Sequence, residues 1–206
     1  MRRQRRDLYV GDEGHNRIRK VSLDTGIISN FVAMSGASPN CAAQPSVIPI
    51  GGYSLTFPLA FDATGRLYFG SSIACGDSGG NGNGPLHGII RRELDGSFTR
   101  ITGKASGTTT DGAPATASAI TGAAALALAG DRLYVSTGHA VKVIDLVNDT
   151  ITTVVGNGSA GAATDYVLAT ATQLSTPYGL ALAPGGHLIV ADQGHFALRW
   201  VWGPLP

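Results

Sequence analysis

The chain has 206 residues, the size of one domain or of part of a larger one. Its 15 Lys and Arg against 14 Asp and Glu leave a formal net charge of +1, which excludes a nucleic-acid binder built on bulk positive charge. A hydrophobic fraction of 43% excludes a disordered chain, and 29 Gly with 10 Pro favour many short strands over long helices. No run of about 18 apolar residues occurs, so no membrane span is expected.

Four related segments recur along the chain after a basic tail at residues 1–6. Each contains a leucine followed by two apolar residues, and successive leucines are 55 to 66 residues apart. This spacing fits one propeller blade plus loops of varying length, because blades run about 40 to 50 residues. The segments are Asp7–Val10, Arg66–Phe69, Arg132–Val135 and His187–Val190.

The third repeat shows the expected strand order of one unit. Asp131, Gly138 and the pair Asn148-Asp149 separate its β-like runs, and such residues accept the positive φ that hairpin turns require. The pattern predicts a four-stranded antiparallel meander, although the Ala/Thr-rich segment 113–127 is also a candidate for a helix. The predicted strands are Ala124–Leu128, Arg132–Ser136, Ala140–Asp145 and Thr150–Val155.

Two of the repeats carry a familiar signature. The first repeat, Leu8–Val21, resembles the signature of the NHL-repeat β-propellers, with the usual Asn-His order at the turn reversed to His15-Asn16. The fourth repeat, Pro177–His195, is similar to it as well. The resemblance covers roughly residues 7–203 and implies an all-β propeller. The expected repeats span about 7–36, 53–104, 123–158 and 174–206.

The expected strands are unevenly shared among the repeats. The first repeat lacks an inner strand, the middle two have four strands each, and the last ends after three. The chain is therefore predicted to be a propeller segment of about three and a half four-stranded antiparallel blades. Because a closed propeller has four or more complete blades, we expect either a larger propeller or self-association.

A glycine-rich loop in the second repeat contains a tempting motif. Gly76–Gly80 has the letters that surround the nucleophile of chymotrypsin-like proteases. A serine nucleophile needs a histidine base held by a carboxylate, but upstream there is only His15, in a repeat turn and without the Ala-His-Cys context. The strand pattern instead makes residues 71–88 a long surface loop, which is where propellers often meet ligands.

The same loop offers oxygen ligands. Asp77, Asn81 and Asn83 form a candidate binding loop that could accept calcium, although it supplies one carboxylate and lacks the spacing of a dedicated calcium loop. The alternative is a surface loop without a metal.

Histidines follow the repeat. His15, His139 and His195 each come directly after a glycine at the turn between the second and third strands, and His87 lies near the end of the corresponding longer loop. Equivalent positions in successive blades share one rim, so these imidazoles are candidates for a central zinc site with an open coordination position. The resemblance to NHL-repeat propellers implies such a use, since some propeller lyases related to NHL repeats use histidines in this way. The alternative is a turn histidine satisfied by backbone or water.

Aromatic residues also occupy regular positions. Tyr9, Tyr68 and Tyr134 share one place in the second strand, which predicts packing between blades. Trp200 and Trp202 are two residues apart, so they point to one face of the last strand. That face is either a binding patch or a surface buried against further chain.

The two cysteines predict one bridge. Cys41 and Cys75 lie in connections that leave a meander on the same rim, and a Cys41–Cys75 disulfide would close a loop of about 35 residues. The alternative is two separate thiols in a reducing cell. The abundance of Gly, Ala, Ser and Thr with few charges resembles exported bacterial proteins, so an extracellular or periplasmic location is expected.

These observations predict a non-catalytic propeller scaffold, without a required cofactor, whose loops bind a protein, a carbohydrate or another ligand. The competing interpretation is a metal-assisted propeller lyase or hydrolase with a central site at His15, His139 and His195. Nucleic acid is not expected as a partner.

Overall fold

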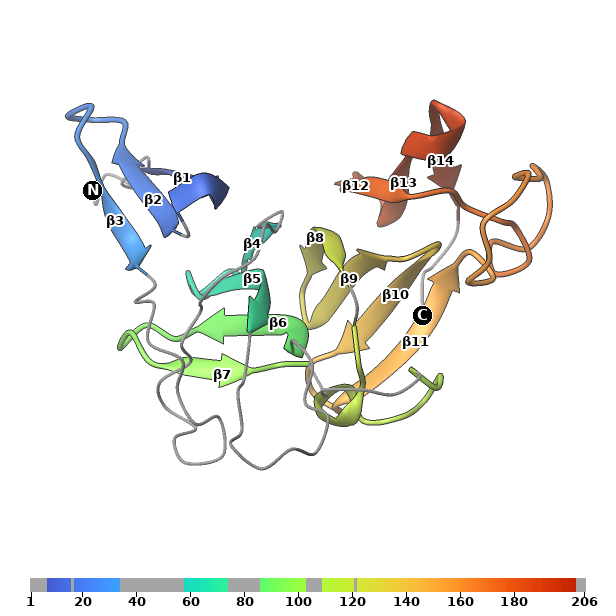
Figure 1. The fold of residues 1–206 in the computed structure, drawn as a ribbon, viewed down its shortest axis with the longest axis horizontal. Helices are drawn as coiled ribbons and strands as arrows, with labels where there is room; N and C mark the ends of the chain where they lie inside the picture. The colour runs from blue at the N-terminus through green and yellow to red at the C-terminus, as the bar shows by residue number, and fades with distance from the viewer. Residues whose placement is uncertain are drawn as a thin grey trace.

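The computed structural model describes residues 7–15, 17–33, 58–73, 86–102, 109–120 and 122–202. Within these residues the chain is all-β, with strands joined in antiparallel sheets and three single turns of 3₁₀ helix. The first two sheets (Figure 1) consist of β1 (Asp7–Asp12), β2 (Arg17–Ser22) and β3 (Ile28–Ala33), and of β4 (Leu59–Phe61), β5 (Leu67–Ile73), β6 (Leu86–Arg92) and β7 (Phe98–Arg100). The last two consist of β8 (Ala123–Ala129), β9 (Arg132–Thr137), β10 (Ala140–Asp145) and β11 (Thr150–Val155), and of β12 (Pro177–Ala183), β13 (His187–Asp192) and β14 (Ala197–Val201). The 3₁₀ turns are η1 (Glu13–His15), η2 (Ala115–Ala117) and η3 (Gln193–His195).

The sheets follow one another along an open arc from the blue N-terminal sheet to the red C-terminal sheet (Figure 1). In the described part of the chain they contain three, four, four and three strands, as the repeats predict. The count of about three and a half blades in this chain stays a prediction.

The third sheet forms where the repeat pattern places it. Its strands β8 to β11 match the predicted runs to within one residue at each end. A two-residue turn joins β9 to β10, and of its two residues Gly138 alone has a positive φ, of 57°. Glycine at the first turn position suits a hairpin, because it accepts this φ without a steric penalty. The helix considered for residues 113–127 is wrong beyond the single turn η2, because the alanines of β8 pair with β9 instead.

Alternate residues of β5, β9 and β13 bind each sheet to the sheet before it. Leu133 and Val135 of β9 are fully buried in a cluster with Tyr68 and Ile89 of the second sheet. We call the side of a sheet that faces its predecessor the leading face, and the opposite side the trailing face. The other buried leading-face residues at these positions are Leu67, Phe69, Leu188 and Val190.

Tyrosines lie on the trailing faces. The Tyr9 ring lies 4.5 Å from that of Phe61 in the second sheet, between ring centroids. Tyr68 is buried in the cluster shared with the third sheet, and Tyr134 in the cluster shared with the fourth. The prediction that these tyrosines pack between blades is confirmed. Their rings supply large apolar areas to the interfaces, which favours a fixed stacking of the sheets.

Candidate functional site

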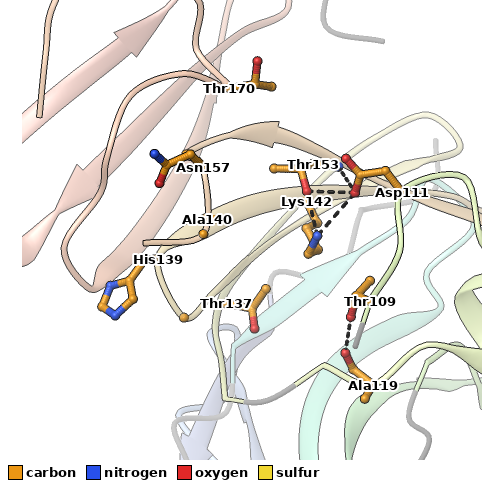
Figure 2. Close-up of a pocket in the computed structure, with 13 residues that line it drawn as sticks. Thr109, Asp111, Ala119, Thr137, His139, Ala140, Lys142, Thr153, Asn157 and Thr170 are labelled. Carbon is orange, nitrogen blue, oxygen red and sulfur yellow. Dashed lines mark hydrogen bonds and ion pairs between the residues drawn. The ribbon is translucent and has the colours of Figure 1, made fainter. Parts of the chain in front are cut away.

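A cavity of about 840 Å³ opens at one end of the third sheet. The β9–β10 turn, the segment that follows β11 and part of the linker before β8 enclose it (Figure 2). Its side chains are mainly short and polar, with hydroxyl, amide and imidazole groups. The lining residues are Thr109, Asp111, Ala119, Thr137, Gly138, His139, Ala140, Lys142, Thr153, Gly156, Asn157, Gly158 and Thr170.

The charged groups of this cavity neutralise each other. Lys142 Nζ donates to Thr153 Oγ1 at 2.6 Å and lies 3.4 Å from Asp111 Oδ1 (Figure 2). Asp111 Oδ1 also accepts hydrogen bonds from the Thr153 backbone N–H and hydroxyl, at 2.9 and 2.8 Å. Burial raises the pKa of Asp111, but the Thr153 hydrogen bonds and Lys142 outweigh it and lower the pKa below its ordinary value. The cavity therefore presents polar groups with little net charge.

His139 is half-buried at the edge of this cavity. Its Nδ1 accepts a hydrogen bond from the Thr176 backbone N–H at 3.5 Å. Its carbonyl oxygen approaches Gly156 so closely that a Cβ there would lie 2.5 Å from it. The segment containing Thr176 also receives a hydrogen bond from the Gln193 N–H, so it connects the His139 turn with the η3 turn.

The other two predicted histidines are held by aspartates. The Nδ1 atoms of His15 and His195 lie 2.8 and 2.7 Å from carboxylate oxygens of Asp12 and Asp192. The spacing Asp-x-x-His-x-x-x-Arg occurs at both turns, and in each case the arginine Nε donates to the same aspartate, at 2.9 and 2.7 Å. Each aspartate therefore ties the turn to the strand that follows it. The arginines are Arg19 and Arg199.

The structure thus places His139 in a different kind of turn from His15 and His195. His15 and His195 end the 3₁₀ turns η1 and η3, whereas His139 occupies a two-residue hairpin turn without the aspartate. Among the described residues, no three His, Cys, Asp or Glu side chains form a group that could hold a metal ion. The zinc site at these three histidines stays a prediction.

Several other predicted residues lie outside the described parts of the chain. They are Cys41, Cys75, Asp77, Asn81 and Asn83, together with the Gly76–Gly80 motif. The disulfide and the calcium-binding loop therefore stay predictions.

A second cavity, of about 450 Å³, lies between the linker after β11 and strand β14. Arg199 lines it, with Nη1 2.8 Å from Oδ1 of Asp165 in the linker. The pair repeats the contact of Lys142 with Asp111, because each linker places a Thr-Asp dipeptide before the next sheet. The sequence signal for these two pairs is the Thr-Asp dipeptide of each linker, Thr110-Asp111 and Thr164-Asp165.

Comparisons with known proteins show the fold alone. No protein-family model matches the sequence, and no curated protein matches it. A solved auxiliary nutrient binding protein from Bacteroides thetaiotaomicron is similar in structure, with TM-score 0.61 and 13% identity over 94% of this chain and 44% of that one. A candidate phosphatase from the same organism has TM-score 0.57 and 15% identity over 95% of this chain and 45% of that one.

A third similar structure is the extracellular domain of a candidate hybrid two-component system from Bacteroides thetaiotaomicron. Its TM-score is 0.50, with 13% identity over 97% of this chain and 20% of that one. These neighbours are β-propeller-like proteins, so the chain has a propeller-like all-β fold. It spans less than half the length of each of them. The described part of the chain contains no helix long and apolar enough to cross a membrane.

Proposed function

We propose that the protein is a non-catalytic β-propeller scaffold of the NHL-repeat type, which binds an uncharged polar ligand in the cavity beside the β9–β10 turn. The ligand class is a short carbohydrate. The protein works outside the cytoplasm, in the extracellular space or the periplasm. The observation that carries the proposal is the hydroxyl- and amide-lined cavity of about 840 Å³, within the size range of small-molecule sites.

The chemistry of the lining supports this ligand class. Thr170 and Asn157 are exposed at the cavity and offer a hydroxyl and an amide, which both donate and accept hydrogen bonds. The cation Lys142 is already bound to Asp111 and Thr153, so an anionic ligand would compete with an internal pair. An uncharged ligand with several hydroxyl groups leaves that pair intact. Fold similarity to a nutrient binding protein and to an extracellular domain agrees with the proposal without identifying the ligand.

A glycan array followed by titration calorimetry tests the proposal. We expect a neutral oligosaccharide to bind, and the variants Thr170→Val and His139→Ala to weaken binding roughly fivefold, because each removes a hydrogen-bonding group worth about 1 kcal/mol. Thr110→Val is the matched control, since Thr110 is an exposed threonine of the linker that does not line the cavity. Equal loss in the control, or no neutral glycan bound at all, would overturn the proposal.

Metal analysis separates the scaffold from the lyase or hydrolase interpretation. The scaffold requires ligand binding that is unchanged after treatment with a chelator. Zinc near one equivalent in the purified protein, lost in His139→Ala and His195→Ala, would instead favour the metal-assisted enzyme.

A further inference from the structure

The trailing face of the fourth sheet is exposed and apolar. Leu198 and Trp200 on β14 are 77% and 44% exposed, and Trp202 beyond the strand is 75% exposed. The two tryptophan rings lie 5.2 Å apart between centroids, and the His187 ring lies 5.1 Å from that of Trp202. The leading face of the same sheet is buried against the third sheet through Leu188, Val190 and Val201.

The strand register identifies this surface as a sheet-packing face. Trp200 pairs with Ile189 on β13, as Val143 pairs with Tyr134 in the third sheet. By the same register, Leu198 corresponds to Val141. Val141 and Val143 are 0% and 2% exposed, because the fourth sheet covers them. The positions of Leu198 and Trp200 are therefore those that a following sheet covers.

The leading face of the first sheet is exposed in the complementary way. Leu8 and Val10 of β1 are 51% and 40% exposed. The residues at the same two positions in the other three sheets are at most 1% exposed, because each packs against the sheet before it. The leading face of the first sheet is thus an apolar surface of the kind that covers the trailing faces of the other sheets, and the trailing face of the fourth sheet has no such cover within the described residues.

We propose that two copies of this chain associate head to tail, with the leading face of the first sheet of one copy packed on the trailing face of the fourth sheet of the other. The same type of interface, trailing face against leading face, already occurs three times within the chain. A second copy continues that established interface and covers both exposed faces with surfaces of the type they meet elsewhere. Such an interface is heterologous, because it joins two different patches of the same molecule.

One contact within the chain shows that these interfaces accept a cation beside an aromatic ring. Arg92 of β6 lies over the ring of Phe31 in the first sheet, 4.4 Å from its centroid. In the proposed interface, the first sheet meets Trp200 and also supplies a cation. This cation is Arg19 of β2, which pairs with Val10 of β1. The combination of aliphatic, aromatic and cationic groups on opposite faces favours this pairing over contact between two identical faces.

Analytical ultracentrifugation of the 206-residue chain tests the proposal. We expect wild-type protein to associate reversibly, and Val10→Asp and Trp200→Asp to weaken association roughly tenfold or more when each is measured alone, as for central apolar interface residues. Both positions are exposed in the single chain, so circular dichroism and the unfolding midpoint should stay close to wild type. Leu8→Lys and Leu198→Lys provide a second pair of variants should either aspartate variant unfold.

Mixing the two variants distinguishes the head-to-tail arrangement from others. Val10→Asp keeps an intact trailing face and Trp200→Asp keeps an intact leading face, so an equimolar mixture should regain one interface and form a mixed dimer. A wild-type chain that stays monomeric at high concentration would overturn the proposal, because the two exposed faces would then not bind a second copy. Association of wild type without recovery in the mixture would overturn it too, because it would require contact between identical faces.

Discussion

At the scale of single residues, aspartates organise the turns of this protein. Asp62 accepts hydrogen bonds from the Thr64 N–H and hydroxyl and from the Arg66 N–H, and its second oxygen lies 2.6 Å from Arg66 Nε. Asp145 caps the turn after β10 in a similar way, through the N–H groups of Val147 and Asn148. A carboxylate that accepts several hydrogen bonds is stabilised in its charged form, so these turns depend on ionised aspartate.

The first prediction concerns acid stability through Asp62. Burial raises the pKa of Asp62, but the hydrogen bonds from Thr64 and Arg66 outweigh it and lower the pKa from 3.8 to about 2. Because the pKa is lower in the folded state, this group stabilises the protein above about pH 4 and the contribution is lost as the pH falls toward 2. After allowance for solvent screening it amounts to about 1 to 2 kcal/mol.

Urea unfolding of wild type and Asp62→Asn between pH 6 and pH 2 measures this contribution. We expect the two free energies of unfolding to differ most at neutral pH and to converge near pH 2. Asp24→Asn, at an exposed turn position, is the control. A constant difference across the whole range would contradict the assignment to ionised Asp62.

The second prediction compares the two Asp-His-Arg turns. The Asp192 side chain is 0% exposed and accepts hydrogen bonds from Arg199, the Ser175 N–H and His195, whereas that of Asp12 is 24% exposed. Burial raises the pKa of Asp192, yet these partners outweigh it and lower the pKa. Asp192→Asn should therefore cost about 3 kcal/mol of unfolding free energy, because it removes the charge of a fully buried carboxylate that binds the partly buried Arg199 and His195. Asp12→Asn should cost clearly less, and equal losses in chemical denaturation would show that burial does not set the strength of the motif.

At the scale of elements, the linkers between sheets carry a repeated turn. In the linker before β8, Gly112 follows the Thr-Asp dipeptide and has a φ of 81°. In the linker before β12, Tyr166 follows it and has a φ of 62°. Only glycine adopts this region without a steric cost, so Tyr166 holds a strained backbone. Its side chain is fully exposed, and burial therefore does not compensate the strain. A strained residue beside the cavity of Arg199 and Trp200 agrees with the observation that strain often gathers near binding sites.

The third prediction exchanges these two residues. Tyr166→Gly should raise the free energy of unfolding by up to about 1 kcal/mol, and Gly112→Tyr should lower it by at least as much. A Cβ at Gly112 would meet nothing within 4 Å, so the second variant measures the backbone cost rather than a clash. Thermal and urea unfolding should give opposite signs for the two variants. Two changes of the same sign would show that the side chains, not φ, decide the outcome.

At the scale of the whole molecule, the stability of the arc comes from the interfaces between sheets. Three buried clusters join the first sheet to the second, the second to the third and the third to the fourth. Each sheet contacts its neighbours along the chain, as in repeat proteins whose stability is a sum of units and nearest-neighbour interfaces. The same residue position can therefore be buried or exposed, depending on whether a preceding sheet covers it.

The fourth prediction uses two leucines at that position. Leu133 is 0% exposed within the second interface and Leu8 is 51% exposed on the first sheet. Leu133→Ala should cost about 2 to 5 kcal/mol because it leaves a cavity between sheets, whereas Leu8→Ala should change the free energy of unfolding by less than about 0.5 kcal/mol. The measurement is made at low protein concentration, where copies of the chain are separate. A large loss for Leu8→Ala there would mean that the exposed face is covered within a single chain.

Local patterns predicted much of this architecture. The strands of the third sheet were predicted closely, because alternating apolar residues and Gly or Asp turns act over a few neighbouring residues. The same local patterns could not show that the three turn histidines lie in two different kinds of turn. They share a preceding glycine, but the length of the turn and the aspartate three residues earlier separate His139 from His15 and His195.

The sequence by itself determined the repeat, the order of the strands and the tyrosines that pack between sheets, since each depends on spacing along the chain. Tertiary structure alone decided which linker reaches which strand. Lys142 pairs with Asp111 and Arg199 pairs with Asp165, at sequence separations of 31 and 34 residues. These two pairs line the two cavities. It also decided that Leu8 and Trp200 are exposed while equivalent residues are buried. Local periodicity assigns a residue to one side of a sheet, but whether that side is covered depends on the packing of distant segments.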